Sequence, residues 1–249
     1  MSGFWAILRR EMLSLWVTPL AWVLLGVFLI LQGGIFYSIV AHFASFADLS
    51  VDEGPLGAYF GQNSIFLLMT LLLVCPALSM RLLAEERRSG TIEALMTAPV
   101  GSAGVVLGKY VAALITYVLI WVPTLLYVLI LRKTGHVDWW VMLASYLGLF
   151  LVGAQYLAIG TLASALTKSQ FVALLVTVLI QFGLFVLGIG EYIFDPGVFH
   201  DVCSYVSLAG HMEDFSKGIV DTRRLLYDAS LSLFCLFLTV RVVDSWRRA

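Results

Sequence analysis

Six long apolar stretches constrain the fold of this chain more than any other feature. A transmembrane α-helix needs about 20 consecutive, mostly apolar residues. The 249-residue chain is 61% hydrophobic and only 12% charged, whereas soluble domains carry about 25% charged residues. We therefore expect an all-α polytopic membrane protein that forms a single transmembrane domain. The predicted spans are residues 19–41, 59–80, 110–131, 139–166, 171–190 and 225–243.

Residues 1–18 combine apolar and charged side chains in a helical pattern. Trp5 belongs to the apolar set, and Arg9, Arg10 and Glu11 interrupt it. Tryptophan is enriched at the level of lipid headgroups, and an amphipathic helix can lie in the plane of the membrane interface. We expect an interfacial helix here, and a plain polar leader is the alternative.

Lys and Arg residues are divided unequally between the two sides of the predicted bundle. With the N-terminus inside, ten of the 15 Lys and Arg residues fall on the inner side, and 11 of the 16 Asp and Glu residues fall on the outer side. Cytoplasmic loops of membrane proteins carry an excess of Lys and Arg. This distribution predicts a multi-pass protein whose N- and C-termini are both cytoplasmic.

The longest polar interruption on the predicted inner side is residues 85–99. It opens with four charged residues and continues as a segment in which Ile92, Leu95 and Met96 share one helical face. A Ser or Thr can cap the start of a helix here, and Pro99 must end it. A soluble partner could bind to such a helix. An ordinary solvated loop is the alternative that the pattern leaves open.

The longest predicted external segment, residues 191–224, is too apolar to be a free loop. Turn-forming residues divide it into two short amphipathic helices, which we expect to fold back toward the outer leaflet. Phe199, Tyr205, His211 and Phe215 are the candidate residues of an outer gate or of a docking surface for a partner. A packed cap that only seals the bundle is an equal alternative.

Several kinds of chemistry are disfavoured by the pattern. The predicted span interiors carry no charged residue, whereas ion-coupled carriers and proton relays need ionisable groups at membrane depth. The segment before Lys109 fails as a phosphate-binding loop, because Ala103 stands where glycine is required and Tyr110 where serine or threonine is required. We expect no catalytic residue, no metal site, no bound cofactor and no nucleic-acid partner for this chain.

The polar stretch and four other segments resemble a known family. Residues 85–100, followed by residues 105–109, are similar to the charged motif of ABC-2 type transporter permeases. Further segments resemble the gliding-motility (GldF-like) branch of that family. These segments are residues 123–127, 145–151, 158–170 and 211–221.

The resemblance implies a bacterial inner-membrane permease that works with a cytoplasmic ABC ATPase, on which ATP and Mg would bind. It implies an elbow helix at residues 1–18, external re-entrant helices before the last span, and a second permease copy, most simply an identical one. Residues 85–99 would be the coupling helix, seated in a cleft of the ATPase. The residues expected to carry coupling are Glu85, Glu86, Arg87, Gly90, Thr91, Glu93, Leu95 and Pro99.

Two other roles compete with transport. The complex could be a membrane anchor that remodels a periplasmic auxiliary protein without moving any substrate. A stand-alone membrane enzyme or scaffold is disfavoured, because no polar residues cluster within the predicted spans.

Overall fold

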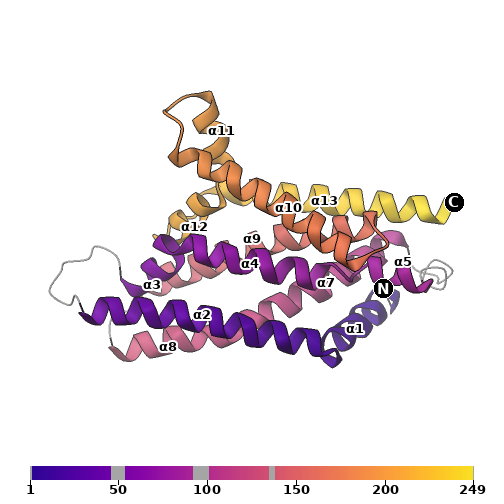
Figure 1. Ribbon diagram of the computed structural model, residues 1–249, viewed down its shortest axis with the longest axis horizontal. Helices are drawn as coiled ribbons and strands as arrows, with labels where there is room; N and C mark the ends of the chain where they lie inside the picture. Colours follow the sequence, from indigo (N-terminus) through magenta and orange to yellow (C-terminus); the bar gives the residue numbers. More distant parts are fainter. Residues whose placement is uncertain (1, 46–53, 92–100, 135–137, 249) are drawn as a thin grey trace.

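The computed structural model describes residues 2–45, 54–91, 101–134 and 138–248, and within these ranges the chain forms helices and no strand (Figure 1). The helices are α1 (Ser2–Val17), α2 (Pro19–Ser45), α3 (Pro55–Gly57), the π-helix η1 (Ala58–Gln62), α4 (Ser64–Ser79), α5 (Ala84–Ser89), α7 (Ser102–Trp121), the 3-10 turn η2 (Val122–Thr124), α8 (Leu125–Thr134), α9 (Trp139–Leu166), α10 (Gln170–Ile189), the 3-10 turn η3 (Gly190–Tyr192), α11 (Val198–Val206), α12 (Leu208–Ser216) and α13 (Thr222–Arg248).

Among the described residues, six helical segments are long and apolar enough to cross a membrane. They are Pro19–Ser45, Ser64–Ser89, Ser102–Lys133, Trp139–Leu166, Gln170–Tyr192 and Thr222–Trp246. The predicted all-α polytopic fold with six spans is thereby confirmed. The third span begins earlier than predicted, at Ser102, and it is interrupted by the 3-10 turn at Pro123.

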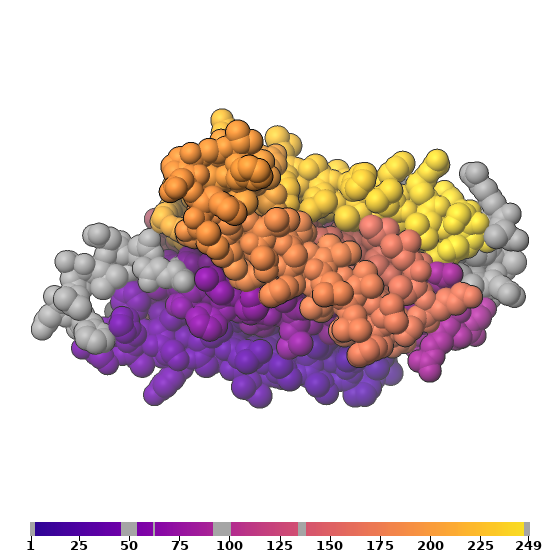
Figure 2. All heavy atoms as spheres, turned by 45° about the horizontal axis from the view of Figure 1, so that its top comes forward, coloured from indigo at the N-terminus to yellow at the C-terminus, as the bar shows by residue number. Residues whose placement is uncertain are grey.

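The helices run lengthwise between two ends of the bundle. Figure 1 shows both chain termini, α1 and α5 at one end, which we call the terminal end. α3, α11 and α12 lie at the opposite end, which we call the distal end. In the space-filling view, α11 and the end of α10 form a raised block at the distal end (Figure 2).

α9 is the central helix of the bundle. It packs against α4, α7, α10, α12 and α13. In its most apolar stretch, 78% of the residues are buried. In the most apolar stretches of the spans formed by α2 and α10, only 28% of the residues are buried. Because α9 is surrounded by other helices, its side chains are available to join parts of the chain that are far apart in sequence.

Glycines let neighbouring helices approach α9 closely. A Cβ atom at Gly153 would overlap the Tyr117 ring on α7, and one at Gly160 would overlap the Ser79 hydroxyl on α4. Small residues at helix contacts are typical of membrane bundles, where packing holds helices together. Gly160 therefore permits the close approach of α4 to α9.

Two features of the sequence reading need correction. The predicted segment 85–99 is not one continuous helix, because α5 ends at Gly90, whose φ of 73° lies in the left-handed region. The prediction of charge-free spans is also incomplete, since the third span begins at Ser102 and so includes Lys109, and both Lys109 and Asp228, near the start of the last span, are buried.

Replacing Gly153 by Ala should destabilise the bundle by about 1–3 kcal/mol, because the buried Tyr117 ring must move to admit the new methyl group. The melting temperature in detergent measures this effect. Gly183→Ala in α10 is the matched control, since a Cβ there meets nothing within 4 Å. A control that melts as low as Gly153→Ala would show that the close contact is not responsible.

Candidate functional site

α5 is a short helix whose sequence suits both of its ends. Glu85 and Glu86 lie in its first turn, and Arg87 and Arg88 lie in its last turn. This arrangement places negative charge at the positive end of the helix dipole and positive charge at the negative end. Gly90 then ends the helix in a conformation that glycine adopts without a steric cost.

α9 caps the start of α5 with a side chain. The Ser164 hydroxyl accepts hydrogen bonds from the backbone N–H groups of Leu83 and Ala84, both at 3.0 Å, and donates one to the Met80 carbonyl at 2.9 Å. The first N–H groups of a helix have no partner within the helix itself. Ser164 therefore supplies from α9 the acceptor that the start of α5 requires.

Arg87 connects α5 to two further places in the bundle. Its Nη1 donates to the Ala165 carbonyl at the end of α9 at 3.0 Å, and its guanidinium carbon lies 4.6 Å from the centroid of the Trp246 ring in α13. The last carbonyls of a helix also lack partners within it, and a cation over a tryptophan face is attracted to it. α5 is thus held against both α9 and α13.

Glu86 joins α5 to α1 and α7 through four charged side chains, Arg10, Glu11, Glu86 and Lys109, which we call the Lys109 network. The Lys109 Nζ lies 2.8 Å from the Glu11 Oε1 and 3.1 Å from the Glu86 Oε1. The Arg10 Nη2 lies 2.9 Å from the Glu11 Oε1 and 2.5 Å from the Glu86 Oε1. Three helices that are distant in sequence therefore share one set of ion pairs.

Burial makes the pairing within this network obligatory. Lys109 is only 1% exposed and Glu86 only 8% exposed, and an unpaired charge in such a place would be strongly destabilising. Two carboxylates and two cations leave the network without net charge. Burial raises the pKa of Glu11, but Lys109 and Arg10 outweigh it, so that the pKa lies below its ordinary value. The hydrogen bond with Glu11 in turn raises the pKa of Arg10.

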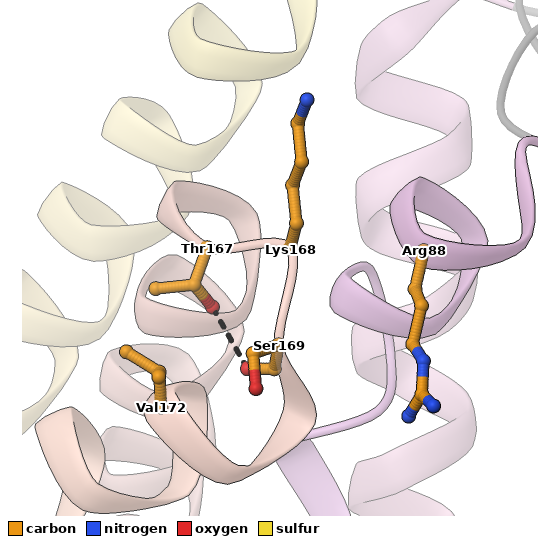
Figure 3. Close-up of a pocket in the computed structure, with 5 residues that line it drawn as sticks. All are labelled: Arg88, Thr167, Lys168, Ser169 and Val172. Atoms are coloured by element: carbon orange, nitrogen blue, oxygen red, sulfur yellow. Dashed lines mark hydrogen bonds between the residues drawn. The ribbon is translucent and has the colours of Figure 1, made fainter.

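Two hollows flank α5 at the terminal end. One has a volume of about 300 Å³, and its lining includes Arg81, Glu85 and Thr91 together with the Lys109 network. The other has a volume of about 360 Å³ and is lined by Arg88, Thr167, Lys168, Ser169 and Val172 (Figure 3). Arg88 and Lys168 come from different elements and point in different directions. α5 therefore presents charged and hydroxyl side chains on two sides.

The structure brings together only part of the predicted coupling residues. Glu85, Glu86 and Arg87 lie on α5. Thr91 lies just beyond α5, and its hydroxyl is 2.9 Å from the hydroxyl of Ser89, the last residue of the helix. Glu93, Leu95 and Pro99 fall outside the described residues.

The predicted interfacial residues of α1 divide into two groups. Trp5 and Arg9 are exposed, whereas Arg10 and Glu11 belong to the Lys109 network. α1 also packs on α7 through a small apolar cluster that includes Leu15 and Ala112. α1 is therefore attached to the bundle by both apolar and ionic contacts.

The predicted outer residues separate into an exposed and a buried pair. Phe199 and Tyr205 on α11 are exposed, whereas His211 and Phe215 on α12 are fully buried. The Phe215 ring fills the space above Gly148 of α9, where a Cβ would overlap it. α12 thus belongs to the packed core, and α11 forms the surface.

Several residues of the site were missed in the sequence. Lys109 is considered above only beside a failed phosphate-binding loop, and no contact of Ser164 or Trp246 with α5 is predicted from the sequence. A lysine inside an apolar stretch is a signal for a buried pair. No sequence signal marks Ser164 as the cap of a helix that begins about 80 residues earlier.

Lys109→Met should lower the free energy of unfolding by about 3–5 kcal/mol, because Glu11 and Glu86 would remain buried with only Arg10 beside them. Adding Glu86→Gln should restore part of the loss. Thermal unfolding in detergent measures both effects. Lys168→Met, at the same end of the bundle, is the control and should cost less than about 1 kcal/mol. Equal losses in the two single variants would contradict the role of the network.

Acid should weaken the network through Glu11. A carboxyl group whose pKa is lowered by folding adds stability above its unfolded pKa, about 4.3 for glutamate, and this stability is lost as the pH falls through the folded pKa. We therefore expect the melting temperature to fall as the pH drops below about 4.3 and this fall to be smaller in Glu11→Gln. Glu213→Gln, which alters an exposed ion pair with Lys217, is the control and should keep the full decrease. An unchanged acid profile in Glu11→Gln would refute this assignment.

Comparison with known proteins places this architecture in a family. No curated protein matches the chain. A family model described as "ABC-2 family transporter protein" matches residues 5–195, from α1 through η3, and so includes the whole Lys109 network. The chain therefore belongs to the ABC-2 family of transporter proteins, which makes it a multi-pass membrane subunit of an ABC transporter with a separate ATPase subunit as its partner.

Proposed function

We propose that this chain is the permease that converts ATP hydrolysis on a cytoplasmic ABC ATPase into rearrangement of its six spans, for export or for mechanical work across the bacterial inner membrane. ATP and Mg bind to the ATPase and not to this chain. Both termini, α1 and α5 face the cytoplasm, as the excess of Lys and Arg at that end favours.

The observation that carries this proposal is the set of contacts made by α5. Ser164 and Arg87 tie it to α9 and α13, and Glu86 ties it to α1 and α7. A partner that displaces α5 must therefore move or strain four other helices. Packed helices and ion pairs of this kind pass between discrete arrangements and do not deform continuously.

The surface around α5 supports docking of the ATPase there. The two hollows on its flanks can receive side chains of a partner, and their lining of Arg88, Lys168, Glu85 and Thr91 offers charges of both signs. The polar stretch continues from Thr91 toward Glu93, Leu95 and Pro99, which we propose as further contacts with the ATPase.

Glu86→Gln should reduce the stimulation of ATPase activity by the permease about two- to thirtyfold, which corresponds to a coupling free energy of about 0.5–2 kcal/mol. The measurement uses the chain reconstituted in lipid with the ATPase that copurifies with it. Glu93→Lys should reduce the stimulation as well, while the protein still inserts into the membrane. Glu213→Gln at the distal end is the matched control, and it should leave the stimulation unchanged. Full stimulation in Glu86→Gln would count against coupling through α5.

One observation favours mechanical or assembly work as the second candidate function. α11 exposes apolar side chains at the distal end, with Val198 80%, Phe199 78% and Val202 59% exposed. A periplasmic auxiliary protein docked there could be remodelled without any substrate crossing the membrane. The resemblance to the gliding-motility branch is compatible with this role. Loss of copurification of a periplasmic protein in Phe199→Asp, with transport intact, would distinguish this function from export.

The complex requires more than one membrane subunit in this proposal. α2 and α10 leave most of their apolar surface uncovered in the single chain. Lipid covers part of these faces, and a second copy of the permease covers the rest. Two permeases and two ATPases then form the working unit.

A further inference from the structure

The distal end contains a buried pair of ionisable side chains that the coupling function does not use. His211 on α12 and Asp228 on α13 both have side chains that are 0% exposed, and the His211 Nδ1 lies 3.6 Å from the Asp228 Oδ1. Both residues lie beyond residues 5–195, to which the family match extends. Ionisable groups inside membrane spans are costly and are therefore usually functional.

Several polar atoms around this pair have no hydrogen-bond partner within the described part of the chain. They are the His211 Nδ1, both carboxylate oxygens of Asp228 and the Tyr156 hydroxyl. Tyr156 lies on α9 and is close enough to Asp228 for an electrostatic interaction. An unsatisfied buried polar group costs about 1–3 kcal/mol. We therefore expect this site to hold a group that forms hydrogen bonds with these atoms.

The hydrogen-bond geometry of His211 indicates that this group is a proton. The Nε2 of His211 lies 3.3 Å from the backbone carbonyl of Tyr205, and because a carbonyl can only accept, the Nε2 must carry a hydrogen. In a neutral imidazole the Nδ1 is then an acceptor, and it faces a carboxylate, which is also an acceptor. Two facing acceptors repel each other unless a proton lies between them.

One proton removes this conflict in either of two ways. It can sit on the Nδ1 of His211, which makes an imidazolium beside a carboxylate, or on Asp228, which then donates to the Nδ1. In both cases the buried pair has no net charge, whereas the pair without the proton is a buried anion.

Among the described residues, no other charged side chain forms an ion pair with His211 or Asp228. α4, α9, α10 and η1, which pack against α12, carry no charged residue. The Arg224 Nη2 is paired with the Asp214 Oδ2 at 2.6 Å, and Glu191 accepts from the Ser204 hydroxyl at 2.9 Å. Further ionisable groups nearby are Glu213 and Lys217, which pair with each other at the surface, Asp201 on α11, Asp221 and Arg223 at the start of α13, and the rings of Tyr156, Tyr205 and Tyr227.

We propose that His211 and Asp228 form a proton-binding site in which one shared proton seats α12 against α13. Any movement that lifts α12 from α13 separates the pair, exposes it to water and lets the proton leave. Opening of the distal end is therefore linked to release of a proton. This proposal goes beyond coupling through α5 and does not depend on the ATPase.

The test measures access to α12 as a function of pH. Ala209→Cys places a thiol at a buried position of α12, in a Cys203→Ser background whose other cysteines, Cys75 and Cys235, are buried. The full chain in lipid nanodiscs is labelled with a water-soluble maleimide. Phe199→Cys on exposed α11, in the same background, gives the reference rate, which removes the effect of pH on the thiol itself.

Docking that holds one proton, which the open state releases to water, is favoured at low pH and is lost as the pH rises. We expect the relative labelling rate of the Ala209→Cys variant to rise at least about threefold between about pH 6.5 and about pH 8.5, with a ceiling of about tenfold per pH unit for one proton.

The isosteric variant separates a proton site from general loosening. His211→Gln with Asp228→Asn keeps hydrogen-bonding groups but cannot exchange this proton, so its relative labelling rate should not change with pH. If that variant does not fold, the labelling rate is measured in Asp228→Asn alone, where it should likewise not change with pH. A flat profile in the unaltered pair, or a rise that persists in the variant, overturns the proposal, and neither result would bear on coupling through α5.

Discussion

A lysine ammonium that is shut off from water needs negative charge beside it, and Lys109 obtains this charge from two different helices. Glu11 of α1 and Glu86 of α5 both lie within 3.1 Å of its Nζ. Neither carboxylate could remain buried without the cations, and Lys109 could not remain buried without the carboxylates. The relative positions of α1, α5 and α7 are therefore determined together, and the apolar packing of the spans must accommodate them.

The two ends of the bundle are connected by the same two helices. α9 provides Ser164 as the cap of α5 at the terminal end, and it provides Tyr156 near Asp228 at the distal end. α13 provides Trp246 under Arg87 and Asp228 opposite His211. α9 and α13 make the most extensive contact between any two helices described. A displacement of α5 thus acts on the helices that also hold α12 in place.

The sequence was sufficient for the number and type of the spans, because an apolar run of sufficient length has few alternatives in a membrane. It also predicted two short helices before the last span, where α11 and α12 are found. It could not place the Lys109 network, since Lys109 is 98 residues from Glu11 and no local pattern records such a pairing. Asp228 lies near the start of the last span, but its burial depends on how α13 packs against its neighbours, which only the tertiary structure determines.

The end of α5 shows a different limit of sequence reasoning. The family resemblance implied one coupling helix over residues 85–99, with Gly90 within it. A glycine can continue a helix or end it in a left-handed conformation. The contacts of α5 with α9 and α13 favour the second choice at Gly90.

The central claim is that the polar stretch beginning at α5 is the surface on which the ATPase acts. Photo-crosslinking in living cells tests it directly, with a photoreactive residue at Thr91 beside α5 or at Val198 on exposed α11. We predict that the residue at position 91 captures an ABC ATPase and that the residue at position 198 does not. Capture of the ATPase from position 198, with none from position 91, would contradict the account.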